Sequence, residues 1–380
     1  MDAPHAPRVV AISQGPTPYY TPILNALAER VQLHVVYMGR GADPGAGAVG
    51  WSDFRDIWGE PPAFEHSYHG SLPIRVGRLD FHARVSVGIS RELRRLDPDV
   101  VLVHSWGPLM MEPLIWSRVA SRRAVMWTES SARTGLLRDP VTMFSRRRLV
   151  ALADAFLSTG TLATRFIEDL GADPRQVVRS CLPSALAETI AGMPMSGREG
   201  AAAGTRFLFI GRLVERKRPV ELARAFVRAL PSLGGATLTF VGDGPLGRRL
   251  AEIAALAGGR IRLVGRVEGQ ALAAQYLEAD VLVIPSVREV WGLVVNEALA
   301  AGLYVVAADE VASAIDLLDD RSGLIIRADD PGKLVDALRS ADKVPQSETQ
   351  RAARRARIRE CTRQSFVTDL HRAIELALSA

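Results

Sequence analysis

The sequence has few cysteines and no long apolar run. Its 380 residues include only two cysteines, Cys181 and Cys361, widely separated in the chain. This usage predicts neither a disulfide framework nor a cysteine-rich metal cluster, and it is typical of a reducing compartment. No stretch reaches the roughly 18 apolar residues of a membrane span. Because residues 1–7 lack a cationic segment followed by an apolar one, we expect no signal peptide, no anchor and a cytoplasmic protein.

The sequence also lacks a strong excess of one charge. Its formal net charge is +5, and the basic residues are spread through both halves. Such a balance does not indicate a nucleic-acid partner. Two basic stretches in the first half could steer it towards an anionic membrane or substrate, although a solvated helical surface is the simpler interpretation. These stretches are Arg118, Arg122, Arg123 and Arg146, Arg147, Arg148.

The composition is that of a globular protein with more than one core. Apolar residues make up 48% and charged residues 23%, which argues against a disordered or fibrous chain. A chain of this length favours two domains. Short β-branched runs alternate with helix-like segments, so we predict an α/β fold with a parallel sheet in each half. The predicted strands are 8–13, 32–37, 100–104, 124–128 and 155–158, then 206–210, 237–241, 260–263, 281–284 and 304–307.

A segment rich in glycine and small residues, 192–204 (GMPMSGREGAAAG), reads as the link between two Rossmann-like domains. We therefore expect a first domain over 1–192, a linker over 193–204 and a second domain over 205–363. A second irregular stretch, 51–68, is aromatic and contains proline. It could shape an acceptor pocket or be a packed loop without a ligand.

The C-terminal segment 364–380 has one apolar helical face, formed by Val367, Leu370, Ile374 and Leu378. Some part of the protein must cover that face. Periodicity alone leaves either domain as its partner, and packing back onto the first domain is one of the two arrangements.

The densest group of candidate functional residues follows the strand predicted at 281–284. Glu289 lies in the next loop, and Glu297 lies in a helix that we expect to begin near Gly292. The free N–H groups at such a helix start, and the positive end of its dipole, suit a diphosphate at the carboxyl edge of the sheet. Gly292 allows that ligand to approach closely. The two carboxylates are then expected to face one crevice.

Carboxylates suit the hydroxyls of a sugar better than the oxygens of a phosphate, so the two glutamates predict contacts with a hexose and a ribose. Cations for the phosphates are available at Arg212 and Lys217, which follow the first strand of the second half with Gly211 at its turn. Two glutamates at this spacing also arise often by chance as solvated surface groups. The surrounding motifs therefore decide their interpretation.

Three segments, in order and spacing, resemble those of the retaining GT-B glycosyltransferases of family 4, also called group 1. They are Gly211-Arg212-Leu213 with Lys217, then the segment 241–245 (VGDGP), then Glu289 and Glu297. The resemblance covers most of the second half and only the layout of the first. It implies two facing Rossmann-like domains with the active site in the cleft between them.

The resemblance also implies roles for individual residues. Arg212 and Lys217 would bind the donor diphosphate and stabilise the leaving nucleotide, while Glu289 would hold the sugar and Glu297 the ribose. Backbone groups of Gly292, Leu293 and Val294 would complete the phosphate site. Segments 241–245 and 265–267, with Gly242 and Val267, would lie near the base and ribose. For Gly242 and Gly244, a plain strand-to-helix turn is an equal alternative.

The first half departs from the family pattern. The loop 13–20 has one glycine, Gly15, where the family often has a pair. Where the family has an active-site histidine after a later strand, this chain has Glu129, while His104 closes the preceding strand. Either residue could meet the acceptor, with a turn or capping role for Glu129 and a structural imidazole for His104 as the alternatives. Tyr19 and Tyr20 are further candidates for acceptor contact.

Two more segments bear on the interpretation. The one Asp-x-Asp, Asp97-Pro98-Asp99, precedes a strand instead of following it, so we read it as a turn and not a metal site. Where the family commonly has Gly-x-Pro-Val, this chain has Gly302-Leu303-Tyr304-Val305. Tyrosine and valine favour strands, so we expect the strand to persist there.

The expected function is transfer of a sugar from a nucleotide-diphosphate sugar to a hydroxyl of a glycan, lipid or natural product. Fixed cations stabilise the charge that builds on the departing diphosphate. The resemblance implies retention of configuration, no metal and no cofactor. A nucleotide-sugar epimerase of the same fold and an inactive nucleotide-sugar-binding subunit are the alternatives. A phosphorylase would need a pyridoxal-binding lysine, for which the sequence offers no clear candidate.

Overall fold

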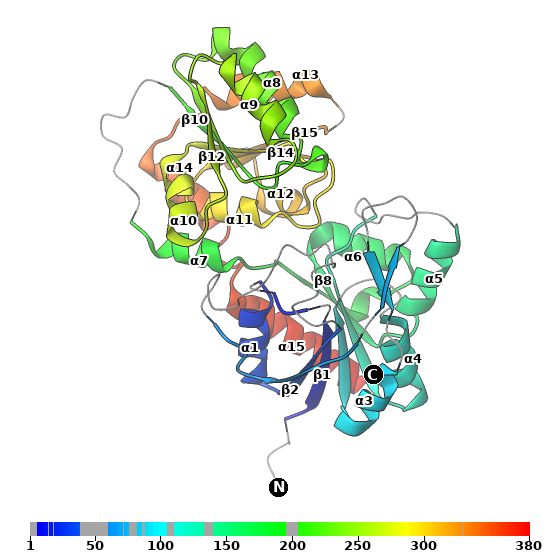
Figure 1. Ribbon diagram of the computed structural model, residues 1–380. Coiled ribbons are helices and arrows are strands. Elements are labelled where there is room, and N and C mark those ends of the chain that lie inside the picture. The colour runs from blue at the N-terminus through cyan, green and yellow to red at the C-terminus, as the bar shows by residue number, and fades with distance from the viewer. Residues whose placement is uncertain are drawn as a thin grey trace. The chain divides into compact units, whose positions relative to one another are not determined.

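The computed structural model describes residues 6–13, 15–17, 19–38, 60–70, 72–75, 82–85, 88–104, 110–132, 140–194, 204–328 and 330–380. The chain forms two compact units (Figure 1). Unit 1 comprises Met1–Cys181 and Arg363–Ala380, and unit 2 comprises Leu182–Thr362. Each unit is a parallel sheet covered by helices on both faces.

The sheet of unit 1 has seven strands in the order β3-β2-β1-β6-β7-β8-β9, all paired in parallel. Most residues of its central strands are buried, as expected for a sheet covered on both faces. The strands are β1 (Arg8–Ser13), β2 (Gln32–Tyr37), β3 (Glu65–Tyr68), β6 (Val100–His104), β7 (Arg123–Thr128), β8 (Ala155–Thr159) and β9 (Val177–Ser180). A separate antiparallel pair is formed by β4 (Leu72–Arg75) and β5 (His82–Val85).

Helices cover the two faces of this sheet differently. The core on one face includes residues of α3 (Ile89–Leu96), α4 (Met111–Val119), α5 (Pro140–Val150) and α6 (Gly160–Asp169). The other face is covered by α1 (Thr21–Ala28) and by the C-terminal helix α15 (Arg363–Ser379), which contacts β7, β8 and β9. Of the apolar face predicted for α15, Val367, Leu370 and Ile374 are buried, and Leu378 is exposed. The partner of this helix is thus unit 1.

The sheet of unit 2 has six parallel strands in the order β12-β11-β10-β13-β14-β15. The strands are β10 (Arg206–Ile210), β11 (Thr237–Val241), β12 (Ile261–Gly265), β13 (Val281–Ile284), β14 (Tyr304–Ala308) and β15 (Gly323–Ile326). The core on one face includes residues of α8 (Pro219–Ala229), α9 (Gly247–Ala255) and α13 (Pro331–Ala341). Across the sheet lie α7 (Ala185–Gly192), α10 (Gly269–Glu278), α11 (Leu293–Ala300), α12 (Ala312–Leu317) and α14 (Glu348–Ala356) (Figure 1).

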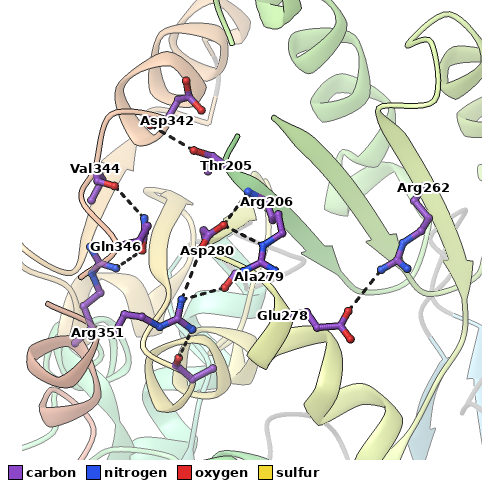
Figure 2. Close-up of polar contacts among 12 residues, drawn as sticks. Thr205, Arg206, Arg262, Glu278, Ala279, Asp280, Asp342, Val344, Gln346 and Arg351 are labelled. Atoms are coloured by element: carbon purple, nitrogen blue, oxygen red, sulfur yellow. Dashed lines mark hydrogen bonds and ion pairs between the residues drawn. The ribbon is translucent and has the colours of Figure 1, made fainter. Parts of the chain in front are cut away.

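A buried polar network ties α14 to the amino-terminal edge of this sheet. Asp280, just before β13, accepts hydrogen bonds from the backbone and side chain of Arg206, at 3.0 and 3.2 Å, and forms an ion pair with Arg351 of α14 at 3.6 Å (Figure 2). Arg351 also donates to the carbonyl of Ala301 at 3.0 Å. Because a buried charge is costly unless it is paired, this network fixes α14 in one position.

The second buried guanidinium of α14, Arg354, explains the departure at Tyr304. Arg354 donates to Gln346 at 2.8 Å and to the carbonyl of Pro345 at 3.0 Å, and its guanidinium carbon lies 5.4 Å from the centre of the Tyr304 ring. Burial and the neighbouring Arg351 lower the pKa of Arg354 to about 10. Tyr304 begins β14, so the predicted strand persists and its aromatic ring packs against the arginine.

The ten strands predicted from β-branched runs are all present, most with the predicted bounds. Three further parallel strands, β3, β9 and β15, were missed. They lie at the ends of the sheets, where short segments such as Glu65–Tyr68 (EHSY) lack a continuous apolar run. In the irregular stretch predicted at 51–68, residues 51–59 lie outside the described residues, and its end is strand β3.

The chain passes between the units at positions that differ from the expected boundaries. Unit 2 begins at Leu182, and α7 belongs to it because α7 packs on α10 and α11. Most of the segment expected as a linker, 195–203, lies outside the described residues. Both cysteines, Cys181 and Cys361, are disulfide-bonded, which the sequence did not predict. Cys181 directly precedes unit 2 and Cys361 lies near its end, so the two cysteines are far apart in the sequence.

Candidate functional site

The candidate donor residues lie where the order of strands in unit 2 reverses direction. After β10 the chain proceeds outward to β11 and β12, and it then returns to β13 on the other side of β10. Ligands of open α/β sheets bind at the carboxyl ends of the strands beside such a reversal. Gly211, Arg212 and Lys217 follow β10, while Glu289 follows β13, so all four come from loops at this position.

The loop after β10 and the loop after β11 both contain glycine, and they contact each other at this edge of the sheet. The N–H of Gly211 donates to the carbonyl of Val241 at 3.0 Å, and the N–H of Leu213 donates to that of Asp243 at 2.7 Å. A Cβ atom at Gly242, where φ is 137°, would lie 2.0 Å from the Gly211 carbonyl oxygen. Only glycine permits this approach, and the loop after β11 therefore fixes the backbone on either side of Arg212.

Lys217 and Glu289 form an ion pair, Nζ to Oε2, and each side chain is 13% exposed. Lys217 ends a short 3₁₀ turn, η3 (Glu215–Lys217). The turn is bonded to the Glu289 loop because the N–H of Val287 donates to the carbonyl of Arg216 at 2.9 Å. The structure thus brings together the expected phosphate-binding cation and the expected sugar-binding carboxylate, from positions far apart in sequence.

The helix after Glu289 begins where it was predicted. Gly292 is the N-cap of α11 with φ of 95°, and Leu293 is the first helical residue. A Cβ at Gly292 would lie 3.0 to 3.2 Å from Val311, Ser313 and Glu289. The Ser313 hydroxyl donates to the Gly292 carbonyl at 2.9 Å, so the helix start is fixed from a neighbouring segment. The first N–H groups of α11 have no intrahelical partner, as at any helix start.

Glu297 differs from Glu289 in its surroundings. It is buried in α11, and its two carboxylate oxygens accept hydrogen bonds from the hydroxyls of Tyr276, at 2.5 Å, and Ser184, at 2.8 Å. Burial raises the pKa of Glu297, and these two hydrogen bonds offset part of the effect. Sequence reasoning missed Tyr276 and Ser184, because only packing brings α10 and the start of α7 to α11.

The other expected donor residues are less enclosed. Arg212 is exposed, and no ion pair of its guanidinium is found within the described part of the chain. Leu293 and Val294 form the first turn of α11 and are half-buried. Val267 is half-buried in the loop that follows β12. Their contact with a donor is an expectation that rests on the resemblance.

In unit 1 the candidate residues also cluster at a reversal of strand order, here between β1 and β6. The hydroxyl of Tyr20 donates to Glu129 Oε1 at 2.8 Å, and His104 Nε2 lies 3.6 Å from the same oxygen. The ring of Tyr20 packs edge-on against His104, with centroids 4.4 Å apart, and Trp127 stacks against His104 at 4.2 Å. Glu129 and His104, two separate alternatives from sequence, are thus neighbours in one cluster.

Tyr20 is the residue that holds this cluster together. Burial and the adjacent Glu129 carboxylate raise the pKa of Tyr20 well above its usual range, so its hydroxyl stays protonated and donates. Gly15 lies nearby in sequence, and a Cβ there would have no atom within 4 Å. The structure therefore gives no steric reason for glycine at that position.

The Asp-x-Asp segment is a turn at the opposite edge of this sheet. Asp97 caps the end of α3 with φ of 44°, and Asp99 accepts a hydrogen bond from the backbone of Arg8 at 2.8 Å. Arg8 and Arg122 form ion pairs with Asp97. These carboxylates are engaged in joining β1, α3 and β7.

The comparisons with known proteins agree with these motifs. Residues 204–341 match the family model described as "Glycosyl transferases group 1". D-inositol 3-phosphate glycosyltransferase 2 of Catenulispora acidiphila is 35% identical over 34% of this chain and 33% of that protein. Phosphatidyl-myo-inositol mannosyltransferase of Mycobacterium leprae is 29% identical over 71% of this chain and 70% of that protein. The chain spans only about a third of the length of the Catenulispora protein.

Among solved structures, HepE of Anabaena in complex with UDP superimposes with a TM-score of 0.72 at 14% identity, covering 97% of this chain and 99% of that one. The fold is therefore that of the GT-B glycosyltransferases, two Rossmann-like α/β domains. Within that class, the resemblance to the group 1 glycosyltransferases is confirmed. Over the described residues, no helix combines the length and the apolar character needed to cross a membrane.

Proposed function

We propose that this chain is a retaining glycosyltransferase that moves a sugar from a nucleotide-diphosphate sugar to a hydroxyl acceptor. The observation that carries the proposal is the ion pair of Lys217 with Glu289 at the strand-order reversal of unit 2, beside the start of α11. A cation and a carboxylate side by side match the two parts of the donor, a diphosphate and a hydroxylated sugar. The HepE structure with UDP supports a nucleotide in this fold.

The proposed roles combine this geometry with the family resemblance. Lys217 and the exposed Arg212 bind the diphosphate and stabilise the charge that develops on it as the bond to the sugar breaks. Glu289 accepts hydrogen bonds from sugar hydroxyls once Lys217 has turned to the phosphates. The first N–H groups of α11 supply further donors to the diphosphate. No metal or cofactor enters this scheme.

Glu297 is proposed as the ribose contact from the family resemblance. Since both its oxygens accept hydrogen bonds from Tyr276 and Ser184, it also holds α11 against α10 and the start of α7. On the acceptor side, we propose that Glu129, with His104 beside it, accepts a hydrogen bond from the acceptor hydroxyl. Tyr20 orients the Glu129 carboxylate for that contact.

Contact with an anionic membrane surface is a second part of the proposal. The outer sides of α4 and α5 expose the apolar residues Met111, Ile115, Val119, Val141 and Phe144. Arg147 and Arg148 are exposed beside them on α5. Apolar groups flanked by cations suit a lipid surface of negative charge. Cosedimentation with vesicles should therefore increase with the fraction of anionic lipid, and equal binding to neutral vesicles would contradict this part.

The test of the proposed reaction is turnover of UDP-, GDP-, ADP- and dTDP-sugars with candidate acceptors. We expect release of the nucleoside diphosphate and a product of retained anomeric configuration by NMR. Lys217→Ala and Glu289→Ala should each lower turnover by about a hundredfold or more, as expected on loss of one preorganised charge contact. Circular dichroism should show both variants folded. Conversion of the sugar without an acceptor would instead identify an epimerase.

A further inference from the structure

Unit 2 contains a cavity with several charged lining residues, and its lining does not include the residues of the proposed donor site. It has a volume of about 210 Å³ and lies between α8, α13 and the carboxyl ends of β14 and β15. Four arginines line it, and neither Lys217, Arg212 nor Glu289 does. The arginines are Arg218, Arg224, Arg228 and Arg327.

The two cavity-lining arginines of α8 repel each other and so destabilise the helix. Arg224 and Arg228 are four residues apart and therefore share one face, where like charges repel. For these two side chains, no ion pair is found in the part of the chain that the structure describes, and both are exposed. Arg218 is fixed, because it donates to the carbonyl of Ala328, just after β15. Within the described residues, Arg224 and Arg228 are therefore cations of the cavity lining without a paired carboxylate.

Asp330 and Glu221 also line the cavity, and they differ in their hydrogen bonds. Asp330 accepts hydrogen bonds from the backbones of Gly332 and Lys333, at 2.9 and 3.2 Å, and so caps α13. Glu221, in the first turn of α8, has a buried Oε2 atom with no hydrogen-bond donor among the described residues. Because Glu221 lines the cavity and no protein donor is found for its Oε2, its carboxylate has acceptor capacity left for the O–H group of a ligand in the cavity.

We propose that this cavity binds a phosphate group that carries or adjoins an O–H donor. The arginines donate charge-assisted hydrogen bonds to the phosphate oxygens. The carboxylate of Glu221 accepts a hydrogen bond from the O–H. In inorganic phosphate that donor is the acid proton, and in a sugar phosphate it is a neighbouring hydroxyl. Sulfate has the same size and shape but no proton near neutral pH, so its oxygens repel the carboxylate.

The experiment is calorimetric titration of the full chain at constant ionic strength with inorganic phosphate, glucose 6-phosphate and sulfate. Inorganic phosphate or glucose 6-phosphate should bind at least about tenfold tighter than sulfate, since sulfate lacks one charge-assisted hydrogen bond to Glu221. Tighter binding of glucose 6-phosphate identifies a phosphomonoester as the ligand, and tighter binding of inorganic phosphate identifies the free anion. Equal affinity for all three anions overturns the proposal.

Variants assign the binding to this cavity. Arg224→Ala with Arg228→Ala, both exposed and outside the core, should weaken phosphate binding about tenfold or more. Glu221→Gln should raise the affinity for sulfate and remove the preference for phosphate over sulfate. The amide of glutamine can donate a hydrogen bond to a sulfate oxygen, whereas the carboxylate repels it. Lys217→Ala should leave phosphate binding unchanged. Loss of binding in Lys217→Ala, or unchanged binding in the double arginine variant, would place the phosphate elsewhere and refute the proposal. Neither result depends on donor turnover, so the proposed function is tested separately.

Discussion

At the scale of single residues, Tyr20 is the strongest candidate that the family pattern does not supply. Its hydroxyl donates to Glu129, which stands where the family has a histidine. In Tyr20→Phe the carboxylate loses this hydrogen bond while the ring contacts with His104 and Trp127 are kept. We expect kcat with the acceptor to fall about tenfold with little change in the donor KM. A rise in the donor KM alone would contradict the assignment of this cluster to the acceptor.

Glu297 gives a prediction for stability against pH. Because its pKa is raised in the folded protein, the unfolded chain loses this proton first as pH rises. The free energy of unfolding therefore falls as pH rises from the unfolded pKa through the folded pKa, and the penalty is fully present above the folded value. Glu297→Gln lacks this titration. Denaturant titrations from pH 4 upward, about the ordinary pKa of glutamate, should show a flatter pH dependence in the variant, and identical slopes would refute the assignment.

The residue scale also shows what the sequence could and could not predict. The local sequence pattern correctly placed Gly292 at the start of α11, because a glycine that opens a helix after a strand is a local feature. The partners of Glu297 were not predictable. Tyr276 and Ser184 reach it only through packing of separate helices, and no short-range pattern records that.

At the scale of elements, the loops after β10 and β11 offer a matched pair of substitutions. Gly242 has a φ of 137°, and a Cβ there would lie 2.0 Å from a backbone oxygen. Gly247 lies in the first turn of α9, and a Cβ there would make only an ordinary contact with Leu213 at 3.7 Å. Gly242→Ala should destabilise the protein by about 2 kcal/mol or more. Gly247→Ala should be neutral or stabilise it by about 0.5 kcal/mol. Thermal denaturation measures both, and equal effects would contradict the close approach.

The buried network of α14 tests how that helix is held. In Asp280→Asn the ion pair with Arg351 is lost, and a buried guanidinium is left without its counter-charge. We expect a loss of about 3 kcal/mol in the free energy of unfolding, the usual cost of breaking a buried pair from one side. Asp336→Asn, which removes an exposed ion pair with Arg339, is the control and should change it by less than about 1 kcal/mol. Similar small losses in both variants would show that the network is not structural.

Strand prediction succeeded in the centre of each sheet, whereas the three parallel strands that it missed, β3, β9 and β15, all lie at sheet ends. Central strands such as β6 and β13 are continuous apolar runs because both faces are covered by helices. The outermost strand β3 (EHSY) is polar and largely exposed, so its composition resembles that of a loop, and β15 (GLII) is a short, partly exposed segment that opens with glycine. The apolar pattern of α15 predicted its buried face, but its partner followed only from the structure.

At the scale of the whole molecule, both cysteines of the sequence, Cys181 and Cys361, are disulfide-bonded. A thiol reagent should therefore find no free cysteine in the denatured, unreduced protein. Reduction should lower the stability by about 2–5 kcal/mol, the usual effect of losing a native disulfide. Detection of two thiols per chain without reduction would contradict the bond.

The central claim, that the carboxyl edge of the unit 2 sheet at Lys217 and Glu289 holds a nucleotide-diphosphate sugar, is tested most directly by calorimetric titration with UDP-, GDP-, ADP- and dTDP-sugars. We expect at least one of them to bind the wild-type chain. Lys217→Ala should weaken that binding at least about tenfold, while the double variant Arg224→Ala/Arg228→Ala should retain it. Failure of all four donors to bind, or equal binding by the wild type and Lys217→Ala, would contradict the claim.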